Sequence, residues 1–364
     1  MVILTGVSGF IGSCVLTWLN ENGYFRDVVV VDDFYKTYKD KNFENKAVRE
    51  FVHRDIFLQW FETTTQHVDL VIHLGARTDT TSTDTEIFDQ LNLNYSKRIW
   101  TVCTQRNIPL IYASSAATYG DGQHGFSDSH DIVPKLQPLN AYAHSKNDFD
   151  AWVLKQEKKP DFWVGCKFFN VYGPNEYHKA RMASVIFHTF HQIRSSGKMK
   201  LFKSHKEGYK NGQQKRDFIY VKDVLSILQH FINNQNSCPS GLYNFGTGLA
   251  RTFEDLAKST FAAMNLKPAI EFIDMPEDIR ESYQYFTEAD MEKLKNEAKY
   301  TNTFYTLEEG IKDYVQNYLM PKNTSDYNFS SSGYCGEGMY FVNGFLSNSI
   351  ILSVLTESII VSTP

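Results

Sequence analysis

The feature that most constrains the fold is a glycine-spaced turn near the N-terminus, Leu4-Thr-Gly-Val-Ser-Gly-Phe-Ile-Gly-Ser13. It directly follows a short apolar run and opens a helical pattern, which is the context that a dinucleotide-binding turn requires. Gly6 permits the tight turn, Gly9 lets the backbone approach a pyrophosphate, and Gly12 lets helix and strand pack closely. An acid, Asp32, ends the next apolar run, about 20 residues after the last glycine. The pattern therefore predicts a dinucleotide site at a helix N-terminus.

Short apolar runs alternate with longer helical patterns over most of the chain. The runs indicate buried strands because each is short and bounded by glycine, proline or a change of periodicity. Strands that alternate with helices imply right-handed crossovers and a mostly parallel sheet with helices on both faces. The sequence thus predicts an α/β fold with a doubly wound parallel sheet of the Rossmann type. The expected strands are 2–5, 28–32, 70–73, 110–113 and 164–169, and the expected helices between them are 10–22, 87–106 and 142–159.

The pattern becomes less regular after residue 173, where shorter elements and a polar loop rich in lysine and glycine follow. We expect a dinucleotide-binding domain at 1–173 that also receives 215–246. A smaller α/β substrate-binding lobe is expected to comprise 174–214 and 247–321. The tail at 322–364 is rich in Ser, Asn and Gly and then in uncharged residues. Its role is open, since an interface helix, an added strand or a simple extension would all fit this composition.

Composition excludes several classes of protein. Of the 364 residues, 42% are hydrophobic and 22% are charged, so global disorder and a coiled coil are excluded. A net charge of -5 argues against a nucleic-acid partner. The five cysteines are scattered without metal-ligand spacing, so no metal site is predicted. The N-terminus has no signal-peptide pattern and the tail no convincing membrane span, so we expect a cytoplasmic protein without a membrane partner.

Charged residues after the second predicted strand bear on the choice of cofactor. Asp32 and Asp33 are placed to accept hydrogen bonds from an adenosine ribose, which usually favours NAD. A nearby cation instead accommodates the extra phosphate of NADP. Lys36, Lys39 and Lys41 follow in a loop that offers such cations, although each fits a solvated loop lysine equally well. The residues alone therefore leave NAD and NADP open.

A second polar cluster follows the predicted strand at 110–113. Ser115 and Thr118 lie just beyond it, and Tyr142 and Lys146 open a helical pattern. Since residues i and i+4 share one helix face, the phenol and the ammonium are expected to point into one pocket. The ammonium and a positive nicotinamide are expected to lower the pKa of Tyr142, so that it exchanges a proton with a substrate hydroxyl. Ser115 or Thr118 would hydrogen-bond the same oxygen.

These motifs together resemble the short-chain dehydrogenase/reductase superfamily, in its extended branch that modifies nucleotide sugars. The resemblance rests on TGxxGFIG, SSAATYG, YxxxK and FNVYGP, in this order along the chain. Narrower motifs at Asn170–Lys179, Met182–His188, Lys215–Phe218 and Tyr283–Asp290 are similar to those of the ADP-L-glycero-D-manno-heptose 6-epimerase family. The likeness extends from the N-terminus to about Leu319, and the HK and KRDF segments are its most specific parts.

The resemblance implies an isomerase that interconverts ADP-D-glycero-D-manno-heptose and ADP-L-glycero-D-manno-heptose at C6, in lipopolysaccharide core biosynthesis. Inversion of this carbinol requires transient oxidation, because the carbon has no acidic proton: a ketone forms, and hydride returns to its other face. The family places a base on each side of the carbon, which here match Tyr142 and Lys179. By residue type alone, Lys179 fits a surface lysine. The family also implies bound NADP and a homo-oligomer, commonly a pentamer.

The site residues follow from the motifs. The catalytic set is Tyr142, Lys146, Lys179 and Ser115. The cofactor set, which includes the three glycines and two loop lysines, is Gly6, Gly9, Phe10, Ile11, Gly12, Asp32, Asp33, Lys39, Lys41, Gly75, Ala76, Arg77, Thr78, Asn92, Lys146 and Val171. The substrate set is Ser115, Asn170, Lys179, Arg181, His188, Phe202, Lys203, Ser204, Arg216 and Tyr283, of which Arg216 suits bidentate binding of diphosphate oxygens.

Two departures from the family pattern bear on substrate contacts. Arg181 stands where the family usually has a small residue, and the loop at 204–214 is longer and more basic. Two other functions compete with the epimerase. A UDP-sugar 4-epimerase of the same branch would not need Lys179. A catalytically silent dinucleotide-binding sensor would not need the serine, tyrosine and lysine of the second polar cluster, and their joint presence argues against it.

Overall fold

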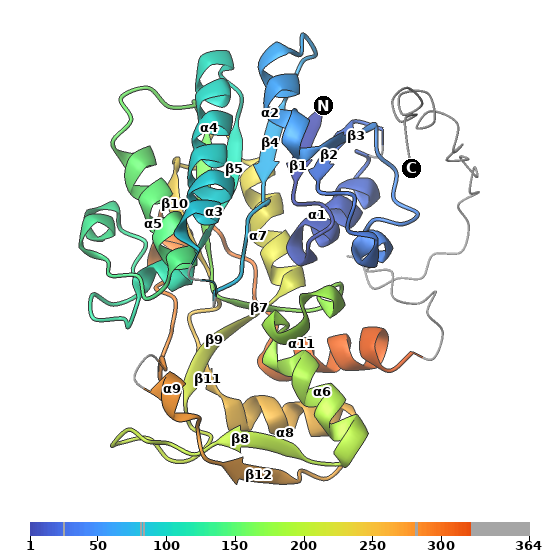
Figure 1. Ribbon diagram of the computed structural model, residues 1–364, viewed down its shortest axis with the longest axis vertical. Coiled ribbons are helices and arrows are strands. Elements are labelled where there is room, and N and C mark those ends of the chain that lie inside the picture. Colours follow the sequence, from blue (N-terminus) through green and yellow to red (C-terminus); the bar gives the residue numbers. More distant parts are fainter. Residues whose placement is uncertain (25, 81, 83, 281–282, 322–364) are drawn as a thin grey trace, which may run out of the picture. The chain divides into compact units, whose positions relative to one another are not determined.

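The largest element of the computed structural model is a seven-stranded sheet. Its strands are β1 Val2–Thr5, β2 Val28–Asp32, β3 Glu50–His53, β4 Leu70–His73, β5 Leu110–Ser115, β6 Trp163–Phe168 and β10 Gly241–Phe245. They run in the order β10-β6-β5-β4-β1-β2-β3, and every neighbouring pair is parallel. The structure describes residues 1–321 except 25, 81, 83 and 281–282, so the predicted tail at 322–364 lies outside the described residues (Figure 1). The described residues belong to one compact unit.

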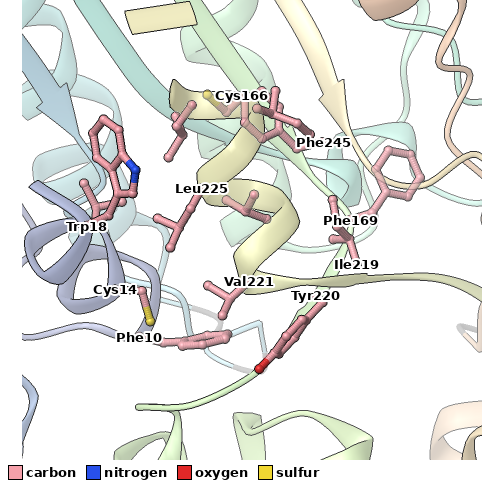
Figure 2. Packing of buried hydrophobic residues seen from close by; sticks show 14 of the residues in the cluster. Phe10, Cys14, Trp18, Cys166, Phe169, Ile219, Tyr220, Val221, Leu225 and Phe245 are labelled. Atoms are coloured by element: carbon pink, nitrogen blue, oxygen red, sulfur yellow. The ribbon is translucent and has the colours of Figure 1, made fainter. Parts of the chain in front are cut away.

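Helices cover both faces of this sheet, as predicted for a doubly wound fold (Figure 1). On one face lie α1 Phe10–Glu21 and α7 Val221–Asn233, and on the other lie α2 Arg54–Thr63, α4 Tyr95–Arg106 and α5 Ala141–Leu154. Because successive side chains of a strand point to opposite faces, Leu4 of β1 joins the first core and its neighbour Ile3 joins the second. Figure 2 shows the first core, with Val221 and Leu225 of α7 alongside Cys14 of α1.

Two small sheets follow in the part of the chain predicted as the substrate lobe. The three-stranded sheet consists of β7 Asn170–Tyr172, β9 Lys215–Tyr220 and β11 Ala250–Thr252, with β9 in the middle. The two-stranded sheet pairs β8 Met199–Phe202 with β12 Ile270–Ile273. It shares a third core with α6 Val185–Ser196 and α8 Phe253–Ala263. Of the segment at 215–246, β10 joins the large sheet and β9 the small one, and the division into two lobes stays a prediction.

Several elements differ from the predicted ones. The strands β3 and β12 and the helix α2 were not expected, because their side chains are largely half-exposed and lack a continuous apolar run. The helix expected at 87–106 is interrupted by a π-helical segment. The remaining elements are η1 Thr37–Asn42, α3 Thr85–Phe88, the π-helical η2 Asp89–Asn94, η3 Ala116–Tyr119, η4 His130–Lys135, η5 Tyr177–Met182, α9 Glu277–Arg280, α10 Glu292–Asn296, α11 Leu307–Tyr314 and the π-helical η6 Val315–Leu319.

Three further features bear on the expectations from composition. Cys14, Cys103, Cys166 and Cys238 are buried free thiols, and Cys335 lies outside the described residues. Within the described ranges, no helix is both long and apolar enough to cross a membrane. In the same part of the chain, no group of three or more His, Cys, Asp or Glu side chains is arranged to hold a metal ion.

Candidate active site

The glycine turn joins β1 to α1, and two of its glycines are required by the space around them. Gly6 has φ +78°, and a Cβ there would lie 2.6 Å from the backbone nitrogen of Gly75. A Cβ on Gly12 would lie 2.1 Å from the carbonyl oxygen of Gly6. At Gly9 the nearest such contact is the carbonyl oxygen of Gly6 at 3.1 Å, which is tight but less severe than at Gly6 and Gly12. The turn therefore leaves its backbone accessible at the N-terminus of α1, where amide groups favour phosphate.

A cavity of about 770 Å³ opens from this turn along the carboxyl ends of the central strands. In doubly wound sheets, ligands bind at this edge, near the point where the strand order reverses. The cavity brings together most of the residues predicted for the cofactor and the reaction. They are Gly6, Gly9, Phe10, Ile11, Gly12, Asp32, Lys39, Gly75, Ala76, Arg77, Thr78, Ser115, Tyr142, Lys146, Asn170, Val171, Lys179 and Arg181.

Acidic and basic side chains meet where β2 ends. Asp32 Oδ2 accepts a hydrogen bond from the Ser8 backbone N–H at 2.9 Å, which ties the acid to the glycine turn. Asp33 does not line the cavity and instead pairs with Lys36 at 3.1 Å and Arg54 at 3.3 Å. Burial opposes ionisation of Asp33, but these cations outweigh it and lower its pKa. Asp33 therefore positions the cations rather than facing a ligand itself.

Three cations line the cavity beside Asp32: Lys36, Lys39 and Arg54. Burial lowers the pKa of Lys39, while the charge of Asp32 opposes this effect. Lys41, which the sequence placed in the same group, is exposed and does not line the cavity. Arg54 was not predicted, because the strand before it was not recognised. Arg54 directly follows β3, the neighbour of the strand β2 that ends in Asp32. A basic residue in such a position is the sequence signal that could have identified it.

Asn92 lies behind the cavity wall and binds the backbone of Arg77, which lines the cavity. Its side chain accepts from the Arg77 N–H at 2.8 Å and donates to the Arg77 carbonyl oxygen at 3.0 Å. It also donates to the Ser145 hydroxyl at 3.0 Å, which connects the segment after β4 to α5. Asn92 is buried and is not among the residues that line the cavity. Its geometry is that of a residue that holds the lining segment in place.

Tyr142 and Lys146 both line the cavity from the first turns of α5. The Lys146 ammonium donates to the Ala113 carbonyl oxygen at 2.8 Å. Burial lowers the pKa of Lys146 to about 8, and the charge of Asp150 acts against it. Burial raises the pKa of Tyr142, a hydrogen bond with Ser115 lowers it, and the charge of Asp150 raises it further. Among the protein's own groups, burial is the largest effect and the pKa of Tyr142 lies above its ordinary value, and its lowering by Lys146 together with a bound nicotinamide stays a prediction.

Lys179 reaches the cavity from η5, on a different part of the chain. Its Nζ lies 5.7 Å from the centre of the Phe10 ring, beside the glycine turn. Burial lowers the pKa of Lys179, and the charge of Glu176 opposes this effect. The neighbouring His178 also lines the cavity, and burial lowers its pKa to about 4, so it is neutral near pH 7. Lys179 is thus a cavity residue and not a solvated surface lysine.

The segment that carries Lys179 is held at its base. Glu176 is buried and accepts from the backbone N–H and the hydroxyl of Ser184 and from the hydroxyl of Tyr314. Ala180, the residue that follows Lys179, has φ 47°, a conformation that favours glycine. Arg181 and Asp79, which both line the cavity, form an ion pair at 3.4 Å. The strained backbone at Ala180 persists only where surrounding contacts fix it.

The remaining predicted substrate residues do not line this cavity. Arg216 is buried, with its guanidinium carbon 5.5 Å from the Tyr283 ring, and Tyr283 lies 6.2 Å from the Phe202 ring. Lys203 pairs with Asp274 at 3.3 Å. Elsewhere, Ser204 bonds within its own loop, and His188 lies half-buried on α6. A second cavity of about 490 Å³ is lined by Gly208, Tyr209, Lys210, Gln213, Lys215 and Phe286.

Comparison with known proteins gives consistent matches. The NAD dependent epimerase/dehydratase family matches residues 2–246. An ADP-L-glycero-D-manno-heptose-6-epimerase of Fusobacterium nucleatum is 45% identical over 334 residues, which cover 89% of this chain and 99% of the relative. One from Nitratidesulfovibrio vulgaris is 45% identical over 327 residues, with 88% and 98% covered.

Solved structures agree. The ADP-L-glycero-D-manno-heptose-6-epimerase of Helicobacter pylori matches with a TM-score of 0.70 at 26% identity, covering 86% of this chain and 94% of that one. A UDP-N-acetylglucosamine 4-epimerase from Methanobrevibacter ruminantium also has a TM-score of 0.70, but at 21% identity, so it shows the fold alone. The resemblance found in the sequence is confirmed. The chain belongs to the NAD dependent epimerase/dehydratase family and, within it, to the ADP-L-glycero-D-manno-heptose-6-epimerases, which are isomerases.

Proposed function

We propose that this protein inverts the C6 carbinol of ADP-glycero-manno-heptose through a transient ketone, with NADP bound in the large cavity. The observation that carries the proposal is that Tyr142 and Lys179, two groups able to exchange protons, line one cavity with the glycine turn. They come from α5 and η5, which are far apart in the sequence. When bound in this cavity, NADP would supply the acceptor for the hydride that leaves C6 and the donor for the hydride that returns to the other face of the carbon.

The chain's own residues move the protons. Ser115 hydrogen-bonds Tyr142 and would hold the carbinol oxygen beside the phenol. The ammonium of Lys146, fixed by the Ala113 carbonyl, would bind the cofactor ribose on the same side. Lys179 would exchange the proton when the sugar presents its opposite face. General acid–base groups of this kind contribute about 10² to 10⁴-fold in rate.

The cofactor choice follows from charge. Lys36, Lys39 and Arg54 line the cavity beside Asp32, where the extra phosphate of NADP would lie. Two of these cations, Lys36 and Arg54, pair with Asp33, so three cations face two acids, and the remaining positive charge favours NADP over NAD because the extra phosphate is negative. We expect Arg54→Gln to weaken NADP binding about tenfold or more and to leave NAD binding nearly unchanged. Equal losses for both dinucleotides, measured by isothermal titration calorimetry, would contradict the assignment to NADP.

The substrate nucleotide is proposed to bind near Arg216, Tyr283 and Phe202. A buried guanidinium between two aromatic rings suits the planar and anionic parts of a nucleotide diphosphate. His188, Lys203 and Ser204 belong to the same proposal by family motif. A cytoplasmic homo-oligomer, commonly a pentamer in the family, is also proposed on membership alone. Light scattering after size-exclusion chromatography measures the subunit number, and a monomer would refute that part.

The central experiment is direct turnover. Purified protein is incubated with ADP-D-glycero-D-manno-heptose, and the C6 proton is followed by NMR. We expect interconversion by the wild-type protein and losses of at least about 100-fold in Tyr142→Phe and in Lys179→Met. UDP-glucose serves as the control substrate. Turnover of UDP-glucose but not of the heptose, with Lys179→Met fully active, would favour a UDP-sugar 4-epimerase and refute the proposal.

A further inference from the structure

Behind the large cavity lies a buried ion pair that the proposed mechanism does not use. Lys167 Nζ on β6 lies 2.9 Å from Asp150 Oδ2 on α5, and both side chains are 0% exposed. Such a pair is costly unless hydrogen bonds satisfy the rest of both groups. Here Asp150 accepts from the hydroxyls of Tyr112 at 3.1 Å and Ser114 at 2.6 Å, and Lys167 also donates to Thr118 at 2.8 Å. The network thus joins α5, β5, β6 and η3.

These elements carry the reacting groups. Asp150 lies one helical turn beyond Lys146 on α5, and Tyr142 lies one turn before Lys146. On β5, Ser114 immediately precedes Ser115 and is paired in register with Lys167 of β6. The Thr118 hydroxyl, which accepts the hydrogen bond from Lys167, in turn donates to the Ser115 carbonyl oxygen at 2.7 Å. The ion pair is therefore connected to Ser115 through Thr118, and its Asp150 shares α5 with Tyr142 and Lys146.

Asp150 also bears on the charge of the site. Its carboxylate raises the pKa of Lys146, which burial lowers to about 8, and it raises the pKa of Tyr142 after burial. The other titratable groups around these side chains are kept neutral. Burial lowers the pKa of His73 on β4 to about 3 and that of His130 to about 4, and it raises the pKa values of Tyr112, Tyr119 and Cys166. Asp150 is the acid that acts on Lys146.

We propose that Asp150 and Lys167 are a positioning pair for the epimerase site. The pair holds the Ser115 end of β5 against the Tyr142 and Lys146 face of α5, and the Asp150 carboxylate supplies the counter-charge of the Lys146 ammonium. This inference rests on the proposed function, because that function assigns the roles of Ser115, Tyr142 and Lys146. An ion pair that only stabilised the core would leave the proton affinities of the site unchanged when it is replaced.

The first test needs no turnover. Lysine labelled with ¹³C at Cε is introduced into the full chain, the Lys146 signal is assigned by its loss in Lys146→Arg, and its pKa is measured by NMR titration. In Asp150→Asn we expect this pKa to fall by about one unit, because an opposite charge nearby is removed. The control Asp148→Asn removes the same charge from an exposed position of the same helix and should leave the value unchanged. An unchanged Lys146 pKa in Asp150→Asn would overturn the proposal.

The second test is the pH dependence of kcat. Loss of the Asp150 charge favours the deprotonated form of Tyr142, so the limb of the profile that reports Tyr142 should move to lower pH by about one unit, while the limb that reports Lys179 on η5 should stay in place. The same loss of activity at every pH, with unmoved limbs, would show a merely structural role and overturn the proposal. If Asp150→Asn does not fold, Asp150→Asn/Lys167→Met removes both buried charges and should give shifts in the same direction but smaller, because the loss of the Lys167 cation acts the other way. Wild-type protein without heptose turnover would refute the proposed function, while the NMR titration would still decide the role of the pair.

Discussion

The substitution Gly12→Ala tests most directly how the glycine turn is built, and Gly9→Ala is its matched control. Both glycines belong to the same turn, and each variant adds one methyl group. At Gly12 the new Cβ would lie 2.1 Å from the carbonyl oxygen and 2.8 Å from the carbonyl carbon of Gly6. At Gly9 it would meet only the same oxygen, at 3.1 Å. Gly12→Ala therefore tests the packing within the turn, and Gly9→Ala tests the access of a ligand to the turn.

The expected magnitude follows from two opposing effects at Gly12. Alanine is favoured over glycine within a helix by up to about 1 kcal/mol. Overpacking costs about 1 to 3 kcal/mol, and here the obstacle is backbone, which the Gly6 N–H fixes to the Val31 carbonyl oxygen at 2.8 Å. We expect a net loss of about 2 kcal/mol in the free energy of unfolding for Gly12→Ala. For Gly9→Ala we expect a change within about 0.5 kcal/mol.

The assay is urea unfolding without ligand and with NADP. A ligand at about 100 times its Kd stabilises the native state by about 2.7 kcal/mol. We expect Gly9→Ala to lose most of this NADP-dependent gain, because its methyl group occupies the space that the pyrophosphate needs. Gly12→Ala should be destabilised already without NADP. Wild-type stability of Gly12→Ala, or a full NADP gain in Gly9→Ala, would refute this account of the turn.

Two further predictions concern buried titratable groups. Burial lowers the pKa of His73 to about 3, so between pH 6 and pH 4 the unfolded chain binds a proton that the native state does not. His73→Asn should therefore remove about 1.4 kcal/mol per pH unit from the slope of stability against pH in urea unfolding, and an unchanged slope would contradict this. Asp217 accepts from the backbone N–H groups of Thr247, Gly248 and Ala289 at 2.8 to 3.0 Å. Asp217→Asn should cost about 3 kcal/mol because the amide NH₂ cannot accept, and a cost below about 1 kcal/mol would show that the network rearranges.

The sequence predicted the centre of the large sheet well and its edge poorly. β1 and β2 are continuous apolar runs because both of their faces are covered by helices. β3 lies at the edge of the sheet, and the exposed Phe51 and half-buried Glu50 give it no such run. α2, which follows it, has only Phe57 and Phe61 as buried residues, a spacing of one turn that is weak evidence in a short segment. Missing this strand and helix also concealed Arg54.

Motifs identified the members of the candidate site better than their roles. Asn92 was expected to contact the cofactor, but its side chain holds the backbone of Arg77. Ion pairs across elements, such as Asp150 with Lys167, have no sequence signal, because neither residue belongs to a spacing pattern that implies the other. The electrostatic effect of burial on Tyr142 is likewise invisible until packing is known. Residue identity can be taken from a motif, whereas distance and burial cannot.

Burial acts in opposite senses on the two groups proposed to exchange protons. It raises the pKa of the Tyr142 phenol and lowers that of the Lys179 ammonium, because both charged forms lose solvation. Burial therefore shifts Tyr142 toward the neutral phenol, which can donate a proton, and shifts Lys179 toward the neutral amine, which can accept one. Under the proposed mechanism, Lys179 would take the carbinol proton as the ketone forms, and Tyr142 would return one to the inverted carbinol. The phenolate and the ammonium that remain are the forms that the reverse inversion needs, so the same two groups would serve both directions.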